Sequence, residues 1–351
     1  MARMPNRGAS NLLRRRAGFQ SALAGWYRRE ARDLPWRKAP SLYKTVVSEF
    51  MLQQTQVKTV LPYFSRWMAA LPDFATLAAE PEARVMKLWE GLGYYSRARN
   101  LRRVAQALVA MPRPPVTAEQ WQELPGIGPY TAAAIASMAF GEPAACVDGN
   151  VVRILARLTA DGRNFGDGAA AAKAFAPIAQ ALIPSEAPGD HNQAMMELGA
   201  VVCLRQHPAC DRCPVRTCCA AAKDARPARY PRLARRRIES QSVTRVWCVR
   251  GNELLLSRAR AGARRLADLH ELPTPEEAGL AEKAVVRGRL LAKKRRSITR
   301  FRIVESIFAA RPPRKSSPGL VWAPVARLDS LVLSGPHRRW IAEILGGRGR
   351  C

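Results

Sequence analysis

Four cysteines between residues 203 and 219 have types and spacing that indicate a metal centre. Cys203, Cys210, Cys213 and Cys219 follow the pattern C-x6-C-x2-C-x5-C, with arginines between them. Four closely spaced thiolates can surround one centre, either an iron–sulfur cluster or a structural zinc ion. Zinc ribbons usually contain two C-x2-C pairs, and only one is present here, which favours the cluster over zinc and over disulfides. The segment therefore predicts one [4Fe-4S] cluster.

Two carboxylates elsewhere could provide a proton donor and a charged group. Glu49 lies in an apolar run of Val, Phe, Met and Leu residues. Burial there should raise its pKa, which suits a proton donor. Asp148 is followed by Gly149 and Asn150, where a helix can begin and where a carboxylate stays charged. The residues alone leave ordinary interpretations open and favoured: Glu49 on a helix surface, and Asp148 as a helix cap.

The segment Leu124–Thr131 has the composition of a tight connection between helices. Gly126 and Gly128 flank one isoleucine, and Pro129 precedes an alanine-rich apolar run from Tyr130 to Phe140. Gly permits backbone conformations that other residues avoid, and Pro fits the first turn of a helix. We expect a helix, a hairpin and a helix whose exposed N–H groups bind a DNA phosphate. An ordinary helix–helix turn explains the glycines equally well.

The charge balance indicates a polyanionic partner. The 351 residues include 57 Lys and Arg against 28 Asp and Glu, a formal net charge of +29 at pH 7. A GC-rich genome would enrich Arg and Ala without depleting acidic residues, so we favour a nucleic acid over an acidic protein or a membrane surface. No apolar run reaches about 18 residues, so no transmembrane helix is expected. The clustered cysteines indicate a reducing cytoplasm.

Apolar periodicity predicts helices throughout the first 200 residues. The expected helices are 17–31, 43–67, 73–80, 81–90, 96–111, 117–123, 130–140, 150–159, 168–183 and 190–202. Between two of them, Trp89–Arg97 contains two glycines and two tyrosines. We expect an exposed turn that presents Tyr94 and Tyr95, with core packing of both rings as the alternative.

The remainder of the chain predicts a smaller α+β domain. Expected strands cover 243–249, 253–257, 298–310 and 320–323, and a last helix covers 337–345. The predicted organisation is a basic tail over 1–16, a helical catalytic domain over 17–222, a basic linker over 223–242 and the α+β domain over 243–351. The arginines of the tail could mimic an organellar presequence, but we expect a disordered tail that contacts DNA.

Six segments, in the same order, resemble the adenine DNA glycosylase branch of the endonuclease III superfamily. They are Leu34–Arg37, Ser48–Val57, Trp89–Arg97, Leu124–Thr131, Val147–Val151 and the four cysteines. The resemblance covers residues 32–219 by motif, and the C-terminal domain more loosely. It implies a mostly α helix-hairpin-helix DNA glycosylase fold with two lobes and a [4Fe-4S] loop. The central lobe would cover about 43–148, and the cluster lobe would cover 17–42 with 149–222.

The resemblance assigns roles around the glycosidic bond. Base removal needs a proton for the departing base and stabilisation of an oxocarbenium-like sugar, which one protonated and one ionised carboxyl group can provide. The family's proton donor falls on Glu49 and its sugar-cation stabiliser on Asp148. Lyase members place a Schiff-base lysine where this chain has Tyr130. Because a phenol cannot form an imine, the resemblance implies a monofunctional glycosylase in which Tyr130 hydrogen-bonds the carboxylates and Asn150 supports them.

The resemblance also implies DNA contacts, because such enzymes flip the target base out and fill the gap. The pair Gln54-Thr55 matches the family's wedge and its contacts with the opposite base, as do Leu92 and Tyr94. Arg37 matches a residue near the adenine pocket.

The C-terminal domain resembles a NUDIX hydrolase that lacks the metal-binding acidic box, so no pyrophosphatase activity is expected. Family members often place Phe-Ser-His on the loop that touches 8-oxoguanine, and the best match here is Ile298-Thr299-Arg300. Thr299 could replace the serine hydroxyl, and Arg300 could hold a phosphate. This departure leaves the strength of the preference for 8-oxoguanine over guanine open.

Together these features predict an enzyme that excises adenine mispaired with 8-oxoguanine or guanine in double-stranded DNA. We expect a monomer without membrane attachment, in the cytoplasm at a bacterial nucleoid, or in the nucleus or mitochondrion of a eukaryote. One alternative is a thymine or uracil mismatch glycosylase, which can share Tyr130 and the cluster; the C-terminal domain favours adenine. The other is a catalytically silent DNA-binding protein, which the intact Glu49 and Asp148 disfavour.

Overall fold

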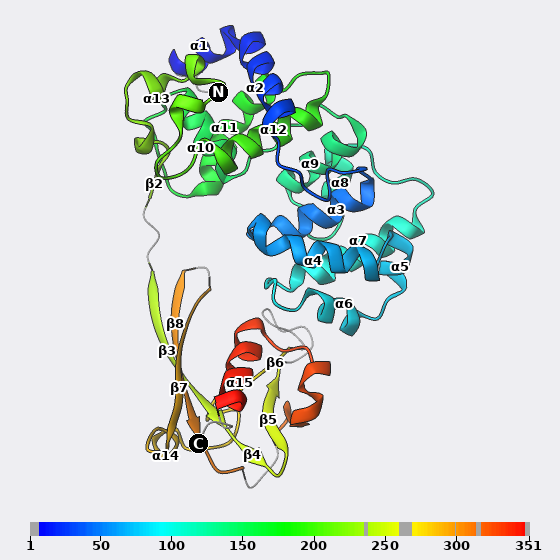
Figure 1. Ribbon diagram of the computed structural model, residues 1–351, viewed down its shortest axis with the longest axis vertical. Helices are drawn as coiled ribbons and strands as arrows, with labels where there is room; N and C mark the ends of the chain where they lie inside the picture. The colour runs from blue at the N-terminus through cyan, green and yellow to red at the C-terminus, as the bar shows by residue number, and fades with distance from the viewer. Residues whose placement is uncertain (1–6, 235–237, 260–268, 299, 314–316, 348–351) are drawn as a thin grey trace. The chain divides into compact units, whose positions relative to one another are not determined.

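The computed structural model describes the chain except for residues 1–6, 235–237, 260–268, 299, 314–316 and 348–351 (Figure 1). The chain divides into two compact units. The first comprises Met1–Ala78 with Arg103–Arg235, and the second comprises Ala79–Arg102 with Arg236–Cys351. The second unit therefore combines residues from the expected helical domain with those of the expected α+β domain.

The first unit is almost entirely helical, as its apolar periodicity predicts. Its helices are α1 (Arg7–Arg14), α2 (Arg16–Glu30), α3 (Leu42–Leu52), α4 (Val57–Ala70), α5 (Phe74–Ala79), α8 (Ala118–Gln122), α9 (Pro129–Phe140), α10 (Gly149–Leu158), α11 (Gly168–Leu182), α12 (Pro188–Val201) and α13 (Ala220–Lys223), and α7 (Ser96–Ala110) spans the boundary between the units. Three-residue 3-10 turns cover Cys210–Arg212, Arg216–Cys218 and Pro227–Arg229. Two short parallel strands, β1 (Asn164–Phe165) and β2 (Arg232–Leu233), complete it.

The N-terminal basic segment is helical from Arg7, and not a disordered tail. In α1, Ala9 and Leu12 are buried, and Leu12 belongs to the same core as Phe19 of α2 and Phe175 of α11. Burial of such side chains provides the free energy that a purely basic tail lacks. The two apolar residues among the arginines are the signal that the sequence prediction overlooked.

The single helix expected over residues 43–67 is two helices, α3 and α4. The chain leaves the helical conformation between them, where Gln54 has a φ of +56°. Gln53 uses its side chain to donate a hydrogen bond to Thr131 Oγ1 (3.1 Å), which ties the end of α3 to α9. Polar side chains that bond elsewhere compete with helix continuation, so the dense polar run 53–56 marks a break.

The second unit contains two small sheets. One has the order β3 (Glu239–Trp247), β8 (Phe301–Ala309) and β7 (Leu290–Ile298), with β3 parallel and β7 antiparallel to β8. The other has the order β4 (Val249–Arg250), β5 (Glu253–Arg258) and β6 (His270–Glu271), and β9 (Leu320–Pro324) also pairs with β5. Helices α6 (Glu82–Trp89), α14 (Glu282–Val286) and α15 (Gly335–Gly347) and a 3-10 turn over Val325–Ser330 complete it. The α+β character is confirmed, although β3 begins inside the expected linker and β7 was not expected.

Between the β3-β8-β7 sheet and α15 the second unit has a polar core. Arg245 of β3 donates to Glu305 of β8 (2.7 Å) and to Glu271 of β6 (2.9 Å). Arg296 of β7 pairs with the same two carboxylates. Burial alone would raise the pKa of Glu271, but His337 of α15 and the two arginines lower it to about 2. Buried charges are tolerated when they are paired in this way.

Across the described residues, every helix is too short or too polar to span a membrane.

Candidate active site

Glu49 is presented by α3 and is almost fully buried, with 5% of its surface exposed. The helix begins after Ser41, whose hydroxyl accepts a hydrogen bond from Lys44 N (3.2 Å). The side chain is surrounded by protein because α3 is buried on nearly all sides. Burial raises the pKa of Glu49 to about 7; the charge of Asp148 raises it further, and a hydrogen bond with Tyr130 opposes the shift. The interpretation of Glu49 as an exposed residue on a helix surface is therefore wrong.

Asp148 is the N-terminal cap of α10, and the capping interpretation is therefore confirmed. One of its oxygens accepts hydrogen bonds from Asn150 N (2.8 Å) and Val151 N (2.7 Å), and the other accepts from Asn150 Nδ2 (2.9 Å). Capping does not exclude a second role here: the negative charge of Asp148 also raises the pKa of Glu49, so the two carboxyl groups lie in one site. Hydrogen bonds from N–H groups suit the charged form of a carboxyl group.

Asn150 is itself held in place. Arg153 Nη2 donates to Asn150 Oδ1 (2.9 Å), and the same guanidinium donates to Gly199 O of α12 (2.8 Å). A Cβ atom at Gly199 would lie 2.6 Å from Asn150 Cβ. Only glycine allows this close approach between α12 and α10, so Gly199 is a site determinant that sequence reasoning missed.

Asn192 is a second missed residue, and it positions the segment that leads to Asp148. Its side chain is buried and accepts a hydrogen bond from Cys146 N (3.0 Å). It also donates to Ala144 O (2.8 Å) and to Ser137 Oγ of α9 (2.9 Å). The extended segment before Asp148 is thereby fixed to both α9 and α12.

Tyr130 lies in the first turn of α9, and its hydroxyl hydrogen-bonds Glu49. Burial and then the charge of Glu49 raise the pKa of Tyr130 well above its ordinary value, so it remains a neutral phenol. The hydroxyl also lies 3.4 Å from Met196 Sδ. The structure thus brings Glu49, Tyr130 and Asp148 together from three separate helices.

The predicted helix, hairpin and helix are confirmed at residues 118–140. Helix α8 begins with a reciprocal capping box between Thr117 and Gln120. Gly126 has a φ of +78°, which L residues rarely adopt, and Gly128 caps α9 with open space around its Cβ position. Exposed N–H groups at this helix start are suited to a phosphate, and phosphate binding remains a prediction.

The guanidinium group of Arg37 is bound to other groups of the protein. It donates to Glu197 Oε2 (2.9 Å) and to Gln193 Oε1 (3.1 Å), and it stacks over the ring of Tyr27. Glu197 is fully buried and also binds Arg32 (2.6 Å). Burial opposes ionisation of Glu197, yet the two arginines bring its pKa below the ordinary value.

The residues expected to contact DNA differ in exposure. Gln54 is exposed in the α3–α4 break, and Thr55 is half-buried. In the second unit, Tyr94 is 45% exposed with a φ of +47°, whereas Leu92 and Tyr95 are buried. The expected exposed turn therefore presents one tyrosine and not two. Thr299 lies outside the described residues.

The four cysteines line one cavity together with Arg157 and Arg216. Arg157 Nη1 lies 3.2 Å from Cys203 Sγ. Within the part of the chain that the structure describes, no three His, Cys, Asp or Glu side chains converge closely enough for a single metal ion. Four thiols around one cavity match the Cys₄ donor set of a [4Fe-4S] cluster. The cluster remains a prediction.

Comparison with known proteins adds an independent observation. Residues 47–176, which contain Glu49, Tyr130 and Asp148, match the HhH-GPD superfamily base excision DNA repair protein family. Residues 47–176 form an HhH-GPD domain.

The curated relatives to which this chain is similar are adenine DNA glycosylases. The human protein is 46% identical over 217 residues, which cover 58% of this chain and 39% of the human protein. The protein from Schizosaccharomyces pombe is 40% identical over 228 residues, which cover 59% of this chain and 49% of the relative. This chain thus spans less than half the length of either relative.

Solved structures share the fold of the helical part of this chain. A thermostable thymine-DNA glycosylase superposes with a TM-score of 0.52 at 26% identity, covering 60% of this chain and 98% of that one. A non-covalent Endonuclease III–DNA complex superposes with a TM-score of 0.50 at 22% identity, covering 61% and 97%. At this identity the second match concerns the fold alone.

Proposed function

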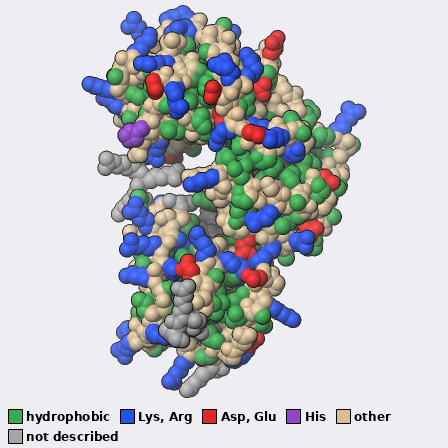
Figure 2. All heavy atoms as spheres, viewed as in Figure 1, with side chains coloured by type: hydrophobic (Ala, Val, Ile, Leu, Met, Phe, Trp, Pro, Cys, Tyr) green, Lys and Arg blue, Asp and Glu red, His purple; other side chains and the backbone are tan. Residues whose placement is uncertain are grey.

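We propose that the chain is a monofunctional DNA glycosylase of base excision repair that removes adenine mispaired with 8-oxoguanine or guanine. The observation that carries the proposal is the buried carboxyl group of Glu49, with a pKa near 7, beside Asp148 in an HhH-GPD domain. The adenine DNA glycosylases among its relatives support adenine as the excised base. The excess of Lys and Arg on the surfaces of both units supports DNA as the partner (Figure 2).

Glu49 provides the proton. A pKa near 7 leaves about half of the carboxyl groups protonated at pH 7, which balances proton availability against donor strength. The protonated group donates to a ring nitrogen of the flipped base, so that the base departs as a neutral molecule. The resulting carboxylate then accepts a proton from the water that attacks the sugar.

Asp148 stabilises the positive charge that develops on the sugar as the base departs. Its carboxylate is fixed by three N–H donors, so it need not reorganise during the reaction. Asn150, Arg153 and Gly199 maintain that orientation.

Tyr130 restricts the chemistry to hydrolysis. The position holds a phenol that hydrogen-bonds Glu49 and has no amine for an imine with the sugar. The reaction therefore ends with an abasic site in an intact strand.

Cys203, Cys210, Cys213 and Cys219 would hold the [4Fe-4S] cluster of this protein. When bound, the cluster supplies four bonds that close the loop over residues 203–219. Arg157 donates to Leu204 O (2.7 Å) and Arg205 O (3.0 Å), and it thereby fixes the backbone of this loop. Arg205, Arg212 and Arg216 remain on the loop as groups that can contact phosphates.

A thymine or uracil mismatch glycosylase is the second candidate. The similarity in fold to a thymine-DNA glycosylase favours it. The chemistry at Glu49 and Asp148 would be unchanged, and only the base pocket and the opposite-strand contacts would differ.

Single-turnover cleavage of duplexes with A:8-oxoG, A:G, T:G and U:G pairs tests the proposal. Strand breaks should occur only after alkali treatment, and only in the two duplexes that contain a mispaired adenine. Excision of T or U but not of A would show that the enzyme is a mismatch glycosylase for those bases. Strand breakage before alkali treatment would contradict the role of Tyr130. Glu49→Gln should abolish excision while duplex binding persists; the exposed Glu186→Gln, the same chemical change elsewhere in the unit, should leave both unchanged.

A further inference from the structure

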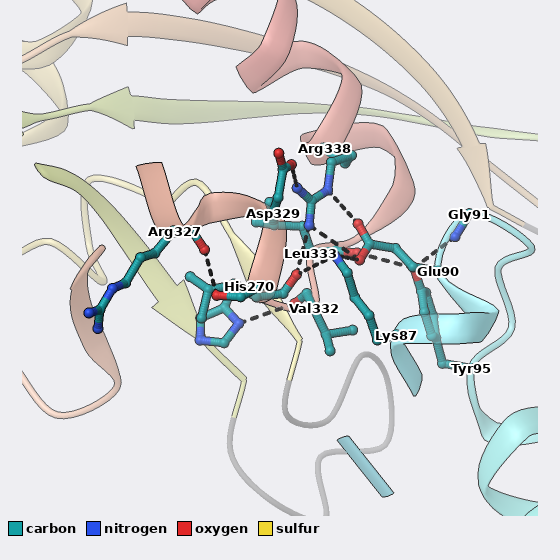
Figure 3. Close-up of polar contacts among 12 residues, drawn as sticks. Lys87, Glu90, Gly91, Tyr95, His270, Arg327, Asp329, Val332, Leu333 and Arg338 are labelled. Carbon is teal, nitrogen blue, oxygen red and sulfur yellow. Dashed lines mark hydrogen bonds and ion pairs between the residues drawn. The ribbon is translucent and has the colours of Figure 1, made fainter. Parts of the chain in front are cut away.

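A group of polar contacts in the second unit holds the turn that follows α6 (Figure 3). Arg338 of α15 donates from Nε to Glu90 Oε1 (2.5 Å) and from Nη2 to Glu90 Oε2 (3.2 Å). Lys87 Nζ donates to the same Oε2 (2.7 Å). Only 9% of the Glu90 side chain is exposed. The bidentate Arg338–Glu90 ion pair is therefore largely shielded from solvent, and pairs of this geometry are strong. None of these residues takes part in the chemistry proposed above.

A second set of contacts holds the other end of the turn. Tyr95 is buried, and its hydroxyl donates to Leu333 O (3.1 Å). Leu331 O accepts from both Lys87 Nζ (3.0 Å) and Arg338 Nη2 (2.7 Å). The turn is therefore attached at its first residue and at its last to the same C-terminal segment.

The residues between these attachments have an unusual backbone. Gly91, Gly93 and Tyr94 have φ values of +103°, +73° and +47°. The value is strained for Tyr94, and such a conformation persists only where its surroundings enforce it. The outcome is that the Tyr94 side chain is exposed while Leu92 and Tyr95 on either side are buried.

The C-terminal segment that receives these contacts is itself fixed. His270 N donates to Val332 O (3.0 Å), and Ser334 N donates to His270 O (3.1 Å), so residues 332–334 lie along β6. Leu333 forms a parallel bridge with His270. His337, the residue before Arg338, lies in the polar core against Glu271 and Glu305. Arg338 therefore extends from a rigid support, whereas its second partner, Asp329, is fully exposed and contributes little.

We propose that Arg338 is a positioning residue: through Glu90 it holds the Gly91–Tyr94 turn in the conformation that exposes Tyr94 for insertion into DNA. Tyr95 and Leu333 O provide the same restraint at the other end of the turn. The α+β region thereby acts on excision through the shape of this turn, in addition to any contact of its own with DNA. The inference rests on the proposed function, since insertion matters only if the chain binds duplex DNA.

Two measurements on Arg338→Ala test the inference, with Arg339→Ala as the matched control. Arg339 is the exposed next residue of α15, so the control removes the same charge without removing the contact. Without DNA, hydrogen exchange at the amides of residues 91–95 should become about tenfold faster or more in Arg338→Ala. Single-turnover excision from an A:8-oxoG duplex should slow by a similar factor. Arg339→Ala should change neither.

A charge exchange provides the rescue. Glu90→Arg alone should accelerate exchange in the turn as Arg338→Ala does, and Glu90→Arg with Arg338→Glu should restore part of the protection and of the excision rate. Unchanged exchange in Arg338→Ala would overturn the attachment. Faster exchange with unchanged excision would overturn the positioning role, as would an equal loss in Arg339→Ala. Wild-type protein that excises no base would instead refute the proposed function, and the exchange measurement would still test the attachment.

Discussion

The pH dependence of excision tests Glu49 as the proton donor. Burial raises the pKa of this residue from 4.5 to about 7. Because a donor must be protonated, the single-turnover rate should be nearly level below pH 7 and should fall tenfold per unit above it. Between pH 5.5 and 7 the protonated fraction falls about twofold for a pKa of 7, but it would fall about 30-fold for an ordinary glutamate.

The assay is single-turnover excision from an A:8-oxoG duplex at saturating enzyme between pH 5 and 9, quenched with alkali. Tyr130→Phe serves as the companion variant, because the hydrogen bond from Tyr130 lowers the pKa of Glu49. Its removal should move the break in the profile to a higher pH. A wild-type rate that keeps rising down to pH 5 would refute a perturbed Glu49. A break that moves to lower pH in the variant would refute the effect assigned to the hydrogen bond.

Three further predictions concern stability, the excision rate and the cluster. The pKa of Glu49 is higher in the folded state, so the folded protein loses stability as the pH rises from 4.5 to about 7. In urea unfolding, the free energy of unfolding of Glu49→Gln should exceed that of the wild type by about 3 kcal/mol at pH 8 and should match it at pH 4. Gly199→Ala places a methyl group 2.6 Å from Asn150 Cβ, so excision should fall by about tenfold or more while duplex affinity is retained, and full activity would show that Asn150 is not held there. Cys213→Ser should lower iron and labile sulfide below about four of each per chain, whereas a zinc-containing, colourless wild type would contradict the cluster.

The helical part of the fold could be predicted because its helices bury regular apolar faces. Glu49 could be identified for the same reason, because a carboxylate between apolar residues of a buried helix is itself expected to be buried. Glu197 sits in a similar run, between Met196 and Leu198, and the same signal would have identified it. Its arginine partners are about 160 residues away. Periodicity cannot reveal such pairings, nor the convergence of Glu49 with Tyr130.

The C-terminal part was harder to predict because its strands are held by charges. Four consecutive basic residues, Lys293 to Arg296, suggest a solvated segment, yet they form the centre of β7. Lys294 and Arg296 turn inward to acidic partners on α15, β6 and β8. Strand propensity gives no indication of this arrangement, because the compensating carboxylates are supplied by other segments. The start of β3 at Glu239 was missed for a related reason, since its first residues are polar and mostly exposed.

The conformation of the turn at residues 91–94 could be predicted only in part from the local sequence. Its glycines predict a turn, and the turn is present. Trp89 and Arg97 bind carbonyl groups of the turn locally. Glu90 and Tyr95 also bind residues more than 230 positions away, and the local sequence gives no sign of these contacts.

The polar core of the second unit has a consequence for how this region can change by insertion and deletion. Glu305 faces inward between strands that carry Arg245 and Arg296. Adding or removing one residue within β8 would turn Glu305 toward solvent and would leave two arginines buried without a carboxylate. The hairpin connection after Ile298 carries no such constraint, because length added there leaves the pairing of both strands unchanged. Variation in length among homologues should therefore concentrate at the tip of the β7–β8 hairpin, while the strands keep their length.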